Sequence, residues 1–205
     1  MPRKLGTLML VVGLLLLAYP AFQWSMAQYH QHQMRQEVEN PVLEARDQEM
    51  EADSRGGQGT AAASADGNQT GAAESQPEHM IIEIPALEVE AVVAPGTTPE
   101  VLAQGPGFYE ETPMPWDDGG NVAIAAHRTT YGARFRHVDR LEEGDLIRLS
   151  GGGREFQYRV EEVFPVASND WSVVDPTGYN ALTLTTCHPP GSAEQRLVVR
   201  ASMEK

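Results

Sequence analysis

The pattern of apolar and polar positions divides the 205-residue chain into three parts. Residues 5–24 form an uncharged stretch rich in Leu, Val, Met and Ala, which as a helix would be about 30 Å long and could cross a hydrocarbon core. Residues 28–78 are polar, and we expect any helix at their start to end near Pro41. These features predict an anchor at residues 1–27, a flexible acidic linker rich in Gly, Ala and Ser at residues 28–78, and a folded domain at residues 79–205.

The charges around the apolar stretch predict its orientation. Arg3 and Lys4 precede it and the next basic residue is Arg35, so the positive-inside rule places the N-terminus in the cytoplasm and the later residues outside. A cleaved signal peptide is the alternative, because Ser25-Met26-Ala27 offers small residues at a possible cleavage site. The length of the stretch favours a retained single-pass anchor in the cell membrane, with the folded domain extracellular.

The folded domain reads as a series of short strands separated by turns. Period-2 alternation or short apolar runs predict strands at residues 80–84, 91–94, 121–126, 146–149, 155–166, 181–187 and 195–201. Short helices are predicted near residues 98–104 and 135–141, the first from the N-cap and Pro pattern at its start. Roughly seven or eight short strands with few helices predict a mainly β domain, a closed or nearly closed antiparallel barrel.

The acidic composition narrows the possible partners. The chain has 15 Lys and Arg against 29 Asp and Glu, a formal charge of −14, and offers no basic face to nucleic acid. Its one cysteine and six scattered histidines lack the paired spacing of metal ligands. We therefore expect no metal and no other cofactor.

The candidate chemistry lies where three strands begin or end. Cys187 ends one predicted strand, His127 ends an earlier one, and Arg196 opens the last one. If the last two strands are antiparallel neighbours, the thiol and the guanidinium lie close together at one end of the sheet. A lone cysteine is usually a small buried hydrophobe, but an exported one has no intramolecular disulfide partner and needs another explanation. Together the three residues predict an activated-thiol site.

Three strings in this order resemble the sortase family, membrane-anchored cysteine transpeptidases of Gram-positive cell surfaces. They are AIAAHRTTYGARF at residues 123–135, LTLTTCHP at 182–189 and QRLVV at 195–199. HRTTYG and TTCHP are most similar to class E. Two positions depart from the family pattern, Ala126 where glycine is expected and Arg134 where proline is common, and the second bears on the shape of the substrate groove.

The resemblance implies a sortase-type β-barrel and a mechanism. Cys187 would attack the Thr–Gly carbonyl of a C-terminal LAxTG or LPxTG sorting motif, giving a thioacyl-enzyme that an amine of a cell-wall precursor resolves. His127 would favour the thiolate and protonate the leaving amine. Arg196, too basic to act as a base, would hold the substrate carbonyl or the oxyanion. The implied partners are secreted proteins that carry the motif, and the amine acceptor.

Four further residues are candidates for substrate binding: Thr130, Tyr131, Thr186 and His188. Tyr131 is either a packed loop aromatic or, as the class E resemblance implies, the residue linked to a preference for Ala at the second motif position. The Thr186 hydroxyl could add to the oxyanion site, and we expect His188 to be a neighbour of the site rather than a second base. Two alternatives stay open: another exported thiol transpeptidase or hydrolase, and a tethered β-barrel binding module with an inert cysteine.

Overall fold

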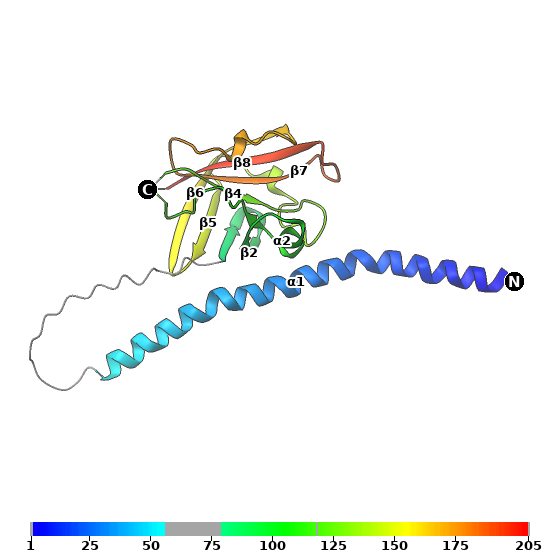
Figure 1. The fold of residues 1–205 in the computed structure, drawn as a ribbon, viewed down its shortest axis with the longest axis horizontal. Helices are drawn as coiled ribbons and strands as arrows, with labels where there is room; N and C mark the ends of the chain where they lie inside the picture. The colour runs from blue at the N-terminus through cyan, green and yellow to red at the C-terminus, as the bar shows by residue number, and fades with distance from the viewer. Residues whose placement is uncertain (1, 56–78, 118, 205) are drawn as a thin grey trace, which may run out of the picture.

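Eight strands close into a barrel, and one long helix runs beside it (Figure 1). The computed structural model describes residues 2–55, 79–117 and 119–204. Around the barrel the strands follow the order β1-β2-β3-β4-β7-β8-β6-β5. The closed, mainly β architecture expected from the alternation is confirmed.

The described strands and helices are short apart from the first helix and β6. The strands are β1 (Met80–Ile84), β2 (Val89–Pro95), β3 (Gly107–Phe108), β4 (Asn121–Ala125), β5 (Leu146–Gly151), β6 (Arg154–Ala167), β7 (Ala181–His188) and β8 (Gln195–Met203). The helices are α1 (Pro2–Arg55), α2 (Pro99–Gln104) and the 3-10 turns η1 (Pro85–Leu87), η2 (Val138–Arg140) and η3 (Ser172–Val174). Thr98 caps α2 as predicted, but the helix predicted at residues 135–141 is only the turn η2. The apolar residues of the predicted helix are nevertheless buried: Phe135, Val138 and Leu141. Their spacing predicted burial correctly but overestimated the length of the helix.

Most strand pairs are antiparallel, and two are parallel: β2 with β3, and β4 with β7. In the second pair Ala125 lies opposite Thr185, so both strands end at the same edge of the barrel. Parallel neighbours require a long crossover connection, and the chain between them builds β5 and β6 on the way. β7 then pairs antiparallel with β8, with Cys187 opposite Arg196.

The two faces of β7 serve different purposes. Leu182 and Leu184 point into the barrel core, where residues from all the longer strands meet. Thr183 and Thr185 alternate with them on the outer face and are also buried, because loops cover this part of the wall. Asn121 ties one of these loops down, since its Nδ2 donates to the carbonyls of Val173 and Asp175.

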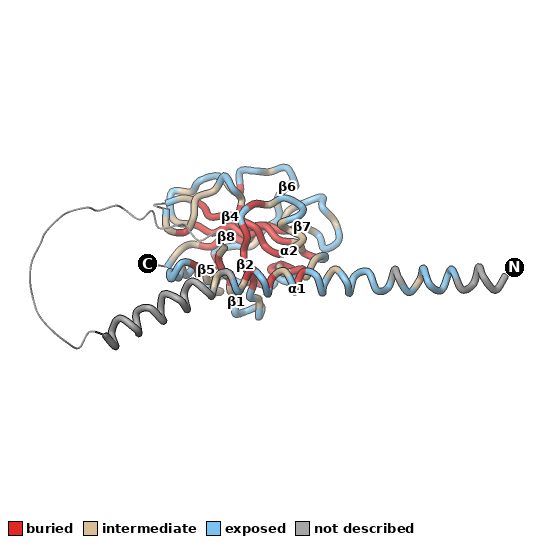
Figure 2. Tube along the Cα trace, turned by 60° about the horizontal axis from the view of Figure 1, so that its bottom comes forward, coloured by how far each residue is buried: buried red, intermediate tan, exposed pale blue. Residues whose placement is uncertain are grey.

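The helix α1 extends well beyond the predicted anchor. Its residues Leu8–Gln36 are long and apolar enough to cross a membrane, and most of the described residues between Leu8 and Met26 are exposed (Figure 2). Residues 28–55, expected in the linker, continue the helix past Pro41. A proline inside a helix removes one backbone hydrogen bond and bends the helix, but it does not always end it. The rest of the expected linker, residues 56–78, lies outside the described residues.

Candidate active site

Cys187 and Arg196 face each other across the last two strands. Arg196 Nη1 lies 4.0 Å from Cys187 Sγ and donates to the carbonyls of Ala193 and Gln195, each at 3.2 Å. The turn between β7 and β8 therefore holds the guanidinium beside the thiol. Cys187 is a free, half-buried cysteine, and a guanidinium keeps its positive charge at all physiological pH values. The arrangement favours an anion at this point, either a thiolate or a developing oxyanion.

His127 comes to the same edge through the parallel pairing of β4 and β7. Ala126 N donates to the carbonyl of Thr185 at 3.2 Å, which continues the pairing to the residue before His127. The imidazole is half-buried and lies against the ring of Tyr131, with 5.1 Å between ring centroids and 40° between planes. Burial lowers the pKa of His127 below its usual range, because desolvation disfavours the charged ring.

Thr186, a candidate oxyanion donor, is hydrogen-bonded within the protein. Its side chain is buried, and its hydroxyl donates to the carbonyl of Ala126 at 2.8 Å. A hydroxyl has one proton, which this bond uses, so it is not available to a substrate oxygen. Thr186 instead ties the end of β7 to the residue preceding His127.

The loop after His127 turns back sharply. Tyr131, Gly132 and Ala133 all have positive φ angles, of 50°, 78° and 46°. Such backbone is uncommon for residues other than glycine and is retained where the surrounding structure fixes it. The turn folds the Tyr131 ring onto His127, while Thr130 is exposed at its start and accepts a bond from Ala133 N through its carbonyl at 2.8 Å.

Arg128 is a site residue that the sequence analysis missed. Its side chain is only 1% exposed, and its Nη2 lies 3.0 Å from Asp139 Oδ1. Nη1 donates to the carbonyl of Cys187 at 3.3 Å and lies 3.0 Å from His188 Nδ1, and Nε donates to the carbonyl of Arg136 at 3.4 Å. It therefore joins the loop after β4 to the end of β7. An arginine that follows an apolar strand usually reads as solvated, so the sequence carried no local signal of this burial.

Arg128 also determines the protonation pattern of His188. A guanidinium only donates, so Nδ1 of His188 must accept, and the neutral ring carries its proton on Nε2. The contact leaves His188 with one outward donor, and its place as a neighbour of the site stays a prediction.

Polar and aromatic side chains lie along the outer face of β7 before Cys187. Tyr109 Oη lies 2.9 Å from Thr185 Oγ1, two residues before the cysteine on the same face. Trp171, from the loop before β7, packs edge-on against Tyr109 with 6.3 Å between centroids and is 64% exposed. The sequence showed Trp171 only as a loop residue, because its partner lies far away in the chain.

The assembled side chains offer nucleophilic and acid–base chemistry. A thiol and a guanidinium lie 4.0 Å apart, an imidazole lies at the same edge of the barrel, and Arg128 bonds the backbone of the cysteine. Within residues 2–55, 79–117 and 119–204, no group of three or more His, Cys, Asp or Glu side chains could hold a metal ion.

The chain is similar to known sortases. The family model for the sortase domain matches residues 82–204. Sortase SrtE1 of Streptomyces coelicolor is 35% identical over 138 residues, covering 60% of this chain and 39% of the relative. Sortase D of Bacillus subtilis is 32% identical over 123 residues, covering 58% of this chain and 60% of the relative. The chain thus spans between 39% and 60% of the length of these two relatives.

Solved structures with the same fold support this comparison. Sortase E1 from Streptomyces coelicolor, solved with a tripeptide in the active site, gives a TM-score of 0.59 at 30% identity and covers 63% of this chain and 89% of that one. A sortase D5 transpeptidase of Clostridium perfringens gives 0.57 at 32% identity, covering 62% of this chain and 79% of that one. The similarity in both cases is to the barrel rather than to the whole chain.

Proposed function

The chain belongs to the sortase family of cysteine transpeptidases, and we propose that it cuts a C-terminal sorting motif and transfers the cut protein to an amine of a cell-wall precursor. The observation that carries this proposal is the pairing of Cys187 with Arg196, 4.0 Å apart, at the barrel edge where β4 delivers His127. The similarity to sortase E1 adds support for a class E-like specificity.

In the first step the Cys187 thiolate attacks the carbonyl carbon of the Thr–Gly bond. The C–N bond then breaks, His127 gives its proton to the leaving glycine amine, and a thioacyl-enzyme remains. Burial lowers the pKa of His127, so its protonated form is a minor species at neutral pH but a ready proton donor. Arg196 supplies a fixed positive charge for the oxyanion.

In the second step an amine attacks the thioacyl carbonyl carbon. His127 accepts the proton of the attacking amine, the C–S bond breaks, and the thiolate returns to its starting state. The nucleophile, the proton carrier and the fixed charge act together in both steps.

Arg128 is a positioning residue in this mechanism. Its bond to the Cys187 carbonyl holds the end of β7, and its contact with His188 Nδ1 leaves His188 with an Nε2–H that can donate to the substrate. Tyr131 and Thr130 contribute the loop side of the substrate site. The exposed Trp171 and the half-buried Tyr109, which bonds the buried Thr185, contribute the strand side.

We also propose the membrane topology predicted from the charges. Residues 1–27 anchor the chain with the N-terminus in the cytoplasm, and the barrel at residues 79–205 lies on the outer side. A tag after Lys205 should then be accessible to protease added to intact cells. Mass spectrometry that finds a mature protein starting at Gln28 would replace the anchor with a cleaved signal peptide.

Turnover of a fluorogenic LAxTG peptide by the full chain tests the reaction. We expect cleavage by the parent, none by Cys187→Ala, and an amide product with triglycine when this amine is added. A hydrolase would give the same acid product whether or not the amine is present. A binding module would give no cleavage, and its cysteine would resist alkylation until the protein is unfolded.

A further inference from the structure

One face of α1 packs against the outside of the barrel. We call residues 27–38 the docked segment. Within it, Ala27, Gln31 and Met34 are only 2%, 7% and 8% exposed, although they belong to a part of the chain that is polar in sequence. Their spacing of four and three residues places them on a single helical face, and Val38 continues that face. The same helix exposes Trp24 and Tyr29 nearby.

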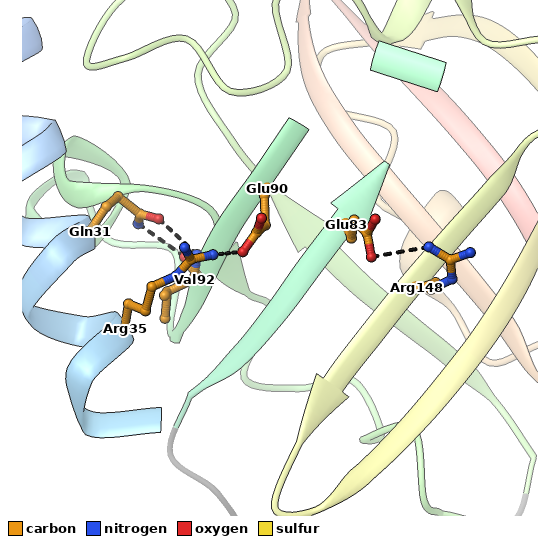
Figure 3. A network of polar contacts seen from close by, with 6 residues as sticks. All are labelled: Gln31, Arg35, Glu83, Glu90, Val92 and Arg148. Atoms are coloured by element: carbon orange, nitrogen blue, oxygen red, sulfur yellow. Dashed lines mark hydrogen bonds and ion pairs between the residues drawn. The ribbon is translucent and has the colours of Figure 1, made fainter. Parts of the chain in front are cut away.

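The central contact is a side chain that bonds a strand edge. Gln31 Oε1 accepts from Val92 N at 2.7 Å, and Gln31 Nε2 donates to the carbonyl of Val92 at 3.0 Å (Figure 3). Gln31 Nε2 also donates to the carbonyl of Gln104 at 3.2 Å. β3 pairs with β2 only at Ala94 and Pro95, so the amide of Gln31 bonds Val92 as a neighbouring strand would. The pairing satisfies polar backbone groups that would otherwise lie at an exposed edge.

The surroundings of Gln31 are shaped to receive it. A Cβ at Gly105 would lie 2.0 Å from Gln31 Nε2, so only glycine leaves room for the amide. Met34 packs against Val92 and Ala94, and Arg35 forms an ion pair with Glu90 (Figure 3). The contact thus combines a buried amide, an apolar side chain and a charge pair.

The docked segment also reaches the loop that follows His127. Gln28 Oε1 accepts from Arg134 Nη2 at 2.7 Å, and a Cβ at Gly132 would lie 3.5 Å from Ala27 Cβ. Arg134 is the position where the chain departs from the proline common in the family. Its pKa is lowered by burial and by the nearby charge of Arg35, which also belongs to this interface. The unusual arginine therefore has a partner on α1.

The order of these contacts shows which part of the barrel lies nearest the N-terminal end of the docked segment. Residues 27 and 28 meet the loop after His127, Gln31 meets Val92, and Arg35 meets Glu90. The loop beside the thiol site therefore lies nearest the apolar part of the helix. Trp24, at the end of the uncharged stretch, precedes Ala27 by only about 4.5 Å of helix rise. In Figure 1 the turn between β7 and β8 lies on the same N-terminal side of the barrel.

We propose that the docked segment holds the catalytic end of the barrel against the outer surface of the lipid bilayer. The thiol site then faces substrates that are themselves attached to or leaving the membrane. The distance between the barrel and the membrane is then set by the packing of α1 against the barrel, and the length of the linker does not determine it. This inference rests on the membrane anchor proposed above and not on the cleavage reaction.

Fluorescence quenching in vesicles tests the orientation. The full chain carries Cys187→Ala to remove the native thiol, and one new cysteine takes a fluorophore, either Ala193→Cys between β7 and β8 or Glu155→Cys near the opposite end of the barrel. The vesicles contain phosphatidylcholine, phosphatidylglycerol and a lipid with a headgroup spin label as quencher. We expect strong quenching at position 193 and weak quenching at position 155.

Variants of α1 identify the cause of that difference. Gln31→Ala should remove it, and so should Met34→Asp, which puts a charge into the contact without changing the barrel. Gln33→Ala is the matched control, because Gln33 is exposed and bonds only Tyr29 on the same helix, and the difference should persist. Equal quenching at both positions in the parent would overturn the proposal, as would a difference that survives both Gln31→Ala and Met34→Asp. Flotation with the vesicles checks the anchor separately, and the inactive background keeps the outcome independent of peptide cleavage.

Discussion

β4 and β7 are parallel neighbours that bring a histidine to the same edge of the barrel, His127 two residues after β4 and His188 at the end of β7, yet the two rings have different surroundings. His127 lies half-buried against Tyr131, and none of the described side chains hydrogen-bonds its ring nitrogens. His188 is bound at Nδ1 by Arg128. Arg128 thus occupies one ring nitrogen of His188, while no described side chain occupies those of His127. The two rings differ in their hydrogen-bond partners rather than in the edge of the barrel at which they lie.

The largest expected effect comes from exchanging these two histidines for alanine. His127→Ala should lower kcat/KM for an LAxTG peptide by about 10²–10⁴-fold, the usual contribution of general acid–base catalysis. His188→Ala removes one hydrogen-bond donor and should cost about tenfold at most. Steady-state kinetics of the two variants measures the contrast. Similar losses of kcat/KM in the two variants would refute the difference between the two histidines. A His127→Ala/Cys187→Ala double variant should be no slower than Cys187→Ala alone.

The second-largest effect is expected from changing Arg128, which contacts the ring of His188. Arg128→Ala leaves the carbonyls of Cys187 and Arg136 without a buried donor and should lower the free energy of unfolding by roughly 1–3 kcal/mol. It should also release His188 from its single tautomer, which ¹⁵N NMR of the imidazole detects directly. Arg128→Lys keeps the charge but loses the planar fork, so it should restore stability only in part. A His188 ring that keeps the Nε2–H tautomer in Arg128→Ala would show that Arg128 is only structural.

A smaller effect is expected from the ring that packs on His127. Tyr131→Phe keeps the packing and removes one hydroxyl, whose hydrogen bond to the substrate would be worth about 0.5–1.5 kcal/mol. The preference for LAxTG over LPxTG should therefore shrink about two- to tenfold without loss of turnover. The ratio of kcat/KM for the two peptides measures it. An unchanged ratio assigns the discrimination to other parts of the site, with Trp171→Ala as the next variant to compare.

The smallest effect is on the pH dependence of stability. Burial lowers the pKa of His127, so the unfolded chain binds this proton more readily than the folded one. The contribution of His127 to stability is complete above pH ~6.5 and is lost as the pH falls from there through the folded-state pKa. His127→Gln should therefore lose less stability between neutral and acidic pH than the parent. Thermal unfolding at several pH values measures this difference. An NMR titration of His127 in Tyr131→Ala tests the cause: an unchanged pKa of His127 would exclude burial by Tyr131 as the reason that it is lowered.

Local patterns in the sequence were sufficient for much of the molecule. Period-2 alternation requires one face of each strand to be buried, so seven of the eight strands could be read from the sequence, but β3 (Gly107–Phe108) is too short to show alternation and was not predicted. Cys187, His127 and Arg196 stand at or near such ends, and for that reason a shared site could be predicted before any pairing was known; the structure places Cys187 opposite Arg196 and the end of β4 at the same edge. The uncharged stretch at residues 5–24 likewise predicts a membrane-crossing helix from its own composition.

Tertiary structure decided everything that depends on contacts between distant residues. The parallel pairing of β4 with β7, the burial of Arg128 and the bond that occupies the Thr186 hydroxyl all join segments about 60 residues apart. Gln31 is a clear case, because a glutamine in a polar segment predicts a solvated helix face. It is buried only because Val92, 61 residues later, presents unpaired backbone groups at a strand edge. Hydrogen bonds of this kind leave no periodicity in the sequence, since neither partner's neighbours need to change to make them.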